Sequence, residues 1–220
     1  MRIDSPTGWL ARPPRSRVVG VVFLFSGAAL LMHILAQVPL RTGLATTFGV
    51  AGFAVVLVWR REDDAGRRRL KARVGVGLAA GVAALVVYDV AKWVLAAVDP
   101  SPFDPFGAIG TFGVLLAGPG ASAPVVLGAG VGYHVLNGVL FGVAFCVLFG
   151  HRGVVAGALW GLFLELFQST LYPGWLDVRF YAEFLGISFL AHVAYGATLG
   201  YLCKRWLRTR TGKLGESVGR

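Results

Sequence analysis

The sequence predicts an all-α integral membrane protein, built as a helical bundle with about six transmembrane helices. Of its 220 residues, 56% are hydrophobic and only 15% are charged, whereas soluble domains are usually about 45–50% apolar and about 25% charged. The apolar residues form continuous runs and do not alternate with polar ones, which favours helices over the strands of a membrane barrel. The 31 glycines agree with this class, because small residues let membrane helices pack closely.

Six apolar runs are long enough to cross a hydrocarbon layer about 30 Å thick, which takes roughly 17–25 helical residues. We place them near 18–38, 43–59, 74–98, 128–149, 153–171 and 184–203. The first run follows several arginines, as a signal peptide does. It is too long for a signal-peptide core and lacks a small-residue cleavage site, so we expect it to remain as the first transmembrane helix.

Lysine and arginine predict the orientation of these helices. They gather in four segments on one side of the predicted membrane: 1–17, 60–73, 150–153 and 204–220. Only Arg41, Arg179 and Lys92 lie elsewhere. Because cytoplasmic segments carry the excess of positive charge, we expect both termini in the cytoplasm and the protein in the inner or plasma membrane. The net charge of +10 therefore marks one membrane face, and we expect no nucleic-acid partner.

The segment 99–127 is the longest one on the predicted outer side. Its proline and glycine content argues against one clean span. The piece FGAIGTFGVLLAG is compatible with a helix in the interface, a re-entrant segment or a seventh span. The chain is thus predicted to have a single transmembrane domain, 18–203, between a basic N-terminal segment, 1–17, and a basic tail, 204–220.

Two predicted hairpins, about 74–149 and 153–203, align with each other. GLAAGVAALVVYDVAK (77–92) aligns without gaps with GVVAGALWGLFLELFQ (153–168), which places Asp89 opposite Glu165 and Lys92 opposite Gln168. HVLNGVLFG (134–142) aligns with HVAYGATLG (192–200). The sequence therefore predicts a tandem helical-hairpin repeat, with an acid on the outgoing helix and a histidine on the returning one.

Five motifs occur together within residues 74–203: YDVAKW, PFDPFGAIG, HVLNG, YPGWLD and HVAYGATLG. As a set they resemble small bacterial multi-pass membrane proteins of uncharacterised function. The resemblance implies a helical membrane fold and carries no established activity or catalytic residue.

Ionisable side chains lie inside the spans at a similar depth, roughly 7–14 Å below the predicted outer boundary at about 1.5 Å per residue. A charge near the centre of a membrane helix costs roughly 2.5–3.5 kcal/mol, so these residues should face the bundle interior and one another. Asp89 and Lys92 are three residues apart and can pair on one helical face. The polar pocket that we predict, open to the outer side, consists of Asp89, Lys92, His134, Asn137, Glu165, Gln168, His192 and Tyr195.

Three GxxxG patterns predict close helix packing. Their glycines are Gly138 and Gly142, Gly157 and Gly161, and Gly196 and Gly200.

Three functions are compatible with this sequence. The pocket could bind or transport a proton, a cation or a small solute, as carboxylate and histidine chains do in transporters. The polar residues could instead only hold the bundle together, in a structural or accessory protein. In a third alternative, Asp89, His134, Glu165 and His192 are candidate metal ligands, or the two histidines bind haem.

The sequence favours a protein that is not an enzyme, because it has no HExxH, no nucleophile motif and no phosphate-binding loop. No motif indicates a specific cofactor. The expected partners are the lipid bilayer and a small solute or ion, and a homo-oligomer is compatible with the sequence.

Overall fold

The structure is a computed structural model that describes residues 15–216. This part of the chain is all-helical and has no strand. Five of its helices are long and apolar enough to cross a membrane, which confirms the predicted helical, membrane-type bundle. In chain order the helices are α1 (Arg15–Val22), α2 (Phe25–Ala36), α3 (Leu40–Arg61), α4 (Asp64–Val98), α5 (Gly107–Ala117), α6 (Ala123–Phe149), α7 (Val154–Leu176) and α8 (Tyr181–Glu216).

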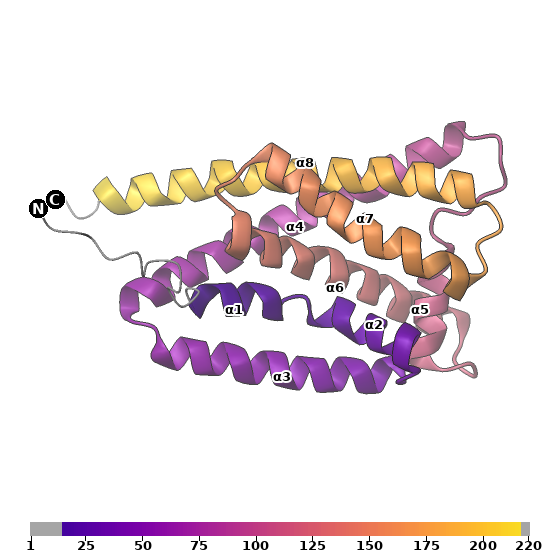
Figure 1. The fold of residues 1–220 in the computed structure, drawn as a ribbon, viewed down its shortest axis with the longest axis horizontal. Coiled ribbons are helices and arrows are strands. Elements are labelled where there is room, and N and C mark those ends of the chain that lie inside the picture. The colour runs from indigo at the N-terminus through magenta and orange to yellow at the C-terminus, as the bar shows by residue number, and fades with distance from the viewer. Residues whose placement is uncertain (1–14, 217–220) are drawn as a thin grey trace, which may run out of the picture.

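The prediction of one continuous helix over 18–38 is wrong. The chain forms α1 and α2 in succession, with a break at Phe23 and Leu24 (Figure 1). At the break, the Leu24 N–H donates to the carbonyl of Val21, three residues back, which interrupts the α-helical hydrogen-bond ladder. A Ser-Gly pair follows directly, and such pairs are a recognised cause of helix breaks. Neither α1 nor α2 reaches the length needed for a span.

The basic segments are more helical than predicted. We expected a loop over 60–73, but α3 ends at Arg61 and α4 begins at Asp64. The side chain of Asp63 accepts a hydrogen bond of 2.6 Å from the Gly66 N–H, the geometry of a helix N-cap. The predicted tail is likewise a continuation of α8 as far as Glu216. The remaining parts of the predicted terminal segments, 1–14 and 217–220, lie outside the described residues.

The long helices pack side by side along the longest axis of the molecule (Figure 1). α8 lies between α7 and α4, and α4 packs on α6. On another side of α6 lie α1 and α2, and α3 packs on these two helices. One end of the bundle contains the α3–α4 junction, the α6–α7 turn and the end of α8 (Figure 1). The opposite end, called the α5 end below, contains α5, the end of α4 and the α7–α8 connection.

α5 rules out the seventh span, one of the three alternatives for 99–127. With 11 residues it is too short to be a seventh span. It packs antiparallel against the first turns of α6, where Gly113 touches the backbone of Val126 and Gly130 touches the backbone of Ile109. α5 therefore stays at the end of the bundle where α4 ends and α6 begins.

Glycines form two close helix crossings. Between α4 and α6, a Cβ at Gly81 would meet the Cα of Gly142 at 3.4 Å, while Gly138 packs against Leu85. Between α7 and α8, a row of four glycines brings the two backbones into direct contact. The row consists of Gly157, Gly161, Gly196 and Gly200.

Candidate functional site

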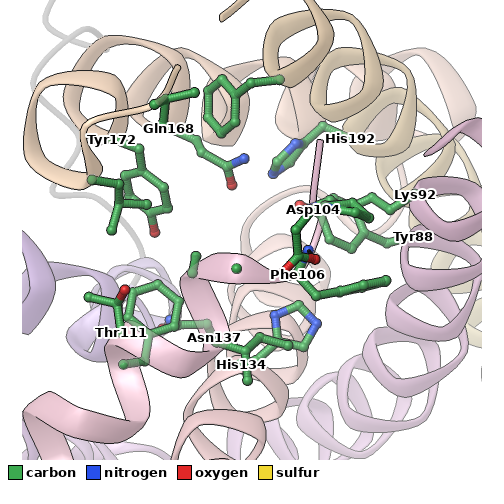
Figure 2. A pocket seen from close by; sticks show the side chains of 18 of the residues that line it. Tyr88, Lys92, Asp104, Phe106, Thr111, His134, Asn137, Gln168, Tyr172 and His192 are labelled. Carbon is green, nitrogen blue, oxygen red and sulfur yellow. Dashed lines mark hydrogen bonds between the residues drawn. The ribbon is translucent and has the colours of Figure 1, made fainter. Parts of the chain in front are cut away.

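A cavity of about 370 Å³ lies at the α5 end, enclosed by α4, α5, α6, α7 and α8. Its volume falls within the range of roughly 300–1,000 Å³ that is usual for small-molecule sites. Many of its polar side chains are visible in Figure 2. Six of the eight predicted pocket residues line it: Lys92, His134, Asn137, Gln168, His192 and Tyr195.

The two predicted acids do not line the cavity, and each is paired with one of its histidines. Asp89 on α4 lies 2.8 Å from Nε2 of His134 on α6. Glu165 on α7 lies 2.7 Å from Nδ1 of His192 on α8. Each pair thus joins the two helices of one predicted hairpin, and in each pair the histidine lines the cavity whereas the acid does not.

The Glu165 pair is the more deeply buried and has two further polar partners. The Ser188 hydroxyl donates a 2.6 Å hydrogen bond to Oε2 of Glu165 and accepts one of the same length from Nε2 of Gln168. Oε1 of Glu165 is buried without a hydrogen-bond partner among the described residues. The result is a short polar chain from the cavity wall to a carboxyl group that has one unused oxygen.

The hydrogen bonds indicate which imidazole nitrogens carry protons. Nδ1 of His192 faces two acceptors, Glu165 at 2.7 Å and the Ser188 carbonyl at 3.0 Å, so it is assigned as the donor. Nε2 of His134 is assigned as the donor to Asp89 on the same grounds. In this assignment the second nitrogen of each ring carries no hydrogen and can accept a hydrogen bond.

Residues 71–213 match DUF6789, a family of unknown function. The chain belongs to this family. The resemblance to an uncharacterised family is thereby confirmed, and the match contains both acid–histidine pairs and the cavity. Comparison with curated proteins and with solved structures gives no match.

Tyr88, which the sequence did not single out, lies against both pairs in this DUF6789 protein. Its ring centroid is 4.8 Å from that of His192 and 6.1 Å from that of His134. Its neighbour Tyr195 donates a 2.6 Å hydrogen bond from its hydroxyl to the carbonyl of Gly138. Selection by charge missed Tyr88, although it directly precedes Asp89. Ser188 lies one helical turn before His192 and shares a helical face with it, but the predicted pocket did not include it.

Lys92 differs from the prediction that it pairs with Asp89. Asp89 pairs with His134, and within the described residues Lys92 makes neither an ion pair nor a hydrogen bond. Its Nζ lies 5.4 Å from the centre of the Tyr88 ring and 5.5 Å from that of Phe106. The side chain is only 9% exposed and lines the cavity (Figure 2). Asp89 and Lys92 do not pair because their side chains point in different directions. Asp89 reaches across to His134 on α6, whereas Lys92 points towards Phe106, just before α5.

The four candidate metal ligands do not form one ligand set. In residues 15–216 no group of three or more His, Cys, Asp or Glu side chains is arranged to hold a metal ion. The candidates are separate pairs, with the Tyr88 ring in contact with both histidines. The predicted set of four metal ligands is therefore not assembled at one point of the described structure.

A second, mostly apolar cavity of about 660 Å³ adjoins the first on the side of α2 and α3. The two cavities share Asn137, Phe141, Gln168, Tyr172 and His192 as lining residues. The polar site therefore has apolar space directly beside it.

Proposed function

We propose that this DUF6789 protein crosses the membrane several times and binds a small solute from the outer side, with proton exchange at the two acid–histidine pairs. One observation carries the proposal: both intramembrane acids bind histidines of a neighbouring helix, and both histidines line the same cavity. Ionisable residues inside membrane helices are costly and usually mark the path of a proton, ion or solute.

The orientation follows from the distribution of charge. Basic residues of the α3–α4 junction, the α6–α7 turn and the end of α8 gather at the end of the bundle opposite the cavity (Figure 1). The positive-inside rule places that end in the cytoplasm. In this arrangement α1 and α2 together make a broken sixth crossing, both termini are cytoplasmic and the cavity faces outward.

A tandem duplication explains why the site has two pairs. The contact of Gly81 with Gly142 in α4–α6 has its aligned counterpart in the contact of Gly157 with Gly200 in α7–α8. The pair of Asp89 with His134 has its counterpart in the pair of Glu165 with His192. These matched contacts support two copies of one hairpin, each contributing an acid and a histidine.

The chemistry is that of a binding site or carrier, and not of an open pore. Next to the cavity, the same helices enclose buried apolar side chains, including Ala84, Phe145 and Leu199. A proton can be held at a histidine, its paired carboxylate or the unused oxygen of Glu165. Release on the other side would require these helices to rearrange, so we expect slow and saturable flux.

Proton flux into liposomes tests this function. Purified wild-type protein and Glu165→Gln are reconstituted with an internal pH-sensitive dye, and a pH gradient is imposed. We expect flux above the protein-free level for wild type and none above it for Glu165→Gln, because the amide cannot hold the exchanged proton. Asp64→Asn makes the same chemical change at an exposed residue of α4 and should leave the flux unchanged. Equal flux in wild type and Glu165→Gln would contradict the proposal.

A structural or accessory role is the second candidate, since each pair also ties the two helices of its hairpin together. Thermal unfolding of the same variants separates the two roles. In a purely structural protein Glu165→Gln lowers stability, and the wild type carries no proton flux above protein-free liposomes.

A further inference from the structure

Lys92 places a buried positive charge in the cavity wall. Among the described residues that line the cavity, no other buried side chain carries a permanent positive charge. It is nine-tenths buried, lines the cavity and makes no hydrogen bond or ion pair there. Cation–π contact with the rings of Tyr88 and Phe106 offsets only part of the free-energy cost of burying an ammonium. An unpaired buried charge of this kind is expected at a site where a ligand supplies the counter-ion.

The nearby acids are engaged elsewhere. Asp89 is bound to His134, and Glu165 is bound to His192 and Ser188. Asp104 also lines the cavity, but it is exposed, and its Oδ1 accepts a 2.9 Å hydrogen bond from the Phe106 N–H just before α5. All three carboxylates are close enough to act on the Lys92 ammonium electrostatically, but none of them lies within ion-pair distance of it.

Two further features make the lining favourable for an anion. The N-terminal turn of α5, with Gly107 and Ala108, forms part of the cavity wall, and helix N-termini carry a partial positive charge. The exposed Arg179 is the other cationic residue of the lining. The histidines His134 and His192 add positive charge whenever they are protonated.

Apart from a few polar side chains such as Asn137 and Gln168, much of the remaining wall is aromatic or apolar. Tyr88, Phe106, Phe112 and Tyr172 line the cavity, and the apolar second cavity adjoins it at Tyr172 and Phe141. A ligand that fills this space needs an uncharged, apolar body beside its anionic group.

We propose that the solute of this site is a small monocarboxylate with an aromatic or aliphatic body, whose carboxylate binds the ammonium of Lys92 while its body packs against the aromatic wall. The inference rests on the proposed function and names its substrate class.

Three probes of one size test the charge of the ligand: benzoate, neutral benzamide and cationic benzylamine. Binding to the purified full-length protein is followed by tryptophan fluorescence, since Trp175 stacks on the cavity residue Phe112 with ring centroids 6.0 Å apart. We expect saturable binding of benzoate and at least tenfold weaker binding of the other two. Preference for benzylamine, or equal binding of benzoate and benzamide, would overturn the proposal.

Variants of Lys92 test the position of the carboxylate. Lys92→Met should weaken benzoate binding at least tenfold without loss of folding, because it removes an unpaired buried charge, whereas Lys92→Arg keeps the charge and should retain most of the affinity. Lys71→Met, a lysine at the other end of α4 beside Trp59, is the matched control. Wild-type affinity in Lys92→Met would overturn the proposal.

The carrier function and the carboxylate site can be contradicted independently of each other. Benzoate binding that is retained in Glu165→Gln, without proton flux in the wild type, supports the carboxylate site and contradicts the carrier. Proton flux that depends on Glu165, without benzoate binding, contradicts the carboxylate site alone.

Discussion

Tyr88 joins the two halves of the candidate site at the scale of single residues. Its ring contacts the histidine of each acid–histidine pair and also lies 6.3 Å from the ring of Tyr195. It is buried, with 7% of its surface exposed. The Tyr88 ring therefore packs against the imidazoles of both pairs.

Tyr195 supplies a direct link between α8 and α6, because its hydroxyl donates to the carbonyl of Gly138. We expect Tyr195→Phe to lower the free energy of unfolding by about 1 kcal/mol, the usual net value of one hydrogen bond. The measurement is chemical unfolding of the purified protein in detergent. Tyr201→Phe is the control, since that ring is 48% exposed and its hydroxyl only accepts a bond from Arg205. An equal loss in both variants would show that the link to Gly138 contributes nothing.

At the scale of helices, the glycine rows decide how closely the hairpins can pack. Small residues let the backbones of α7 and α8 touch, which in turn sets Glu165 and His192 within hydrogen-bond distance. The close packing of α7 and α8 therefore determines the distance between Glu165 and His192.

Two glycine substitutions should change stability in opposite directions. A Cβ at Gly157 would collide with the carbonyl oxygen of Gly196, so Gly157→Ala should cost about 1–3 kcal/mol, as overpacking usually does. Gly186 on α8 has nothing within 4 Å of an added Cβ, and Gly186→Ala should stabilise its helix by about 0.5–1 kcal/mol. Thermal unfolding measures both. Stabilisation by Gly157→Ala would contradict the close crossing.

Hydropathy predicted the positions of the long helices because an apolar run of span length has few alternatives. It did not predict the break at Phe23 and Leu24, since a missing backbone hydrogen bond leaves no trace in hydropathy. It also took the charged start of α4 for a loop, although Asp63 offers a helix cap. Sequence alone selected six residues that line the cavity, because polar side chains are conspicuous in apolar runs. Their partners depend on how the helices rotate, and this is why the local pair with Lys92 was expected in place of His134.

The whole molecule is polarised along its longest axis. The basic segments lie at one end, while the cavity and α5 lie at the other (Figure 1). The DUF6789 match covers residues 71–213. It contains α5, α6, α7 and most of α4 and α8, but none of α1, α2 or α3. The site is therefore built from the family region alone, with the first three helices packed beside it.

Thiol labelling tests the orientation proposed for this polarity. Gly120→Cys lies in the exposed turn between α5 and α6, and Arg152→Cys lies in the exposed α6–α7 turn at the other end. The native Cys146 and Cys203 are buried and should not react, so the wild type is the control. We expect a membrane-impermeant maleimide to label Gly120→Cys in intact cells and Arg152→Cys only after permeabilisation, because positive charge retains the second turn in the cytoplasm. The reverse labelling pattern would show the opposite orientation, with the cavity and the carboxylate site proposed for it on the cytoplasmic side.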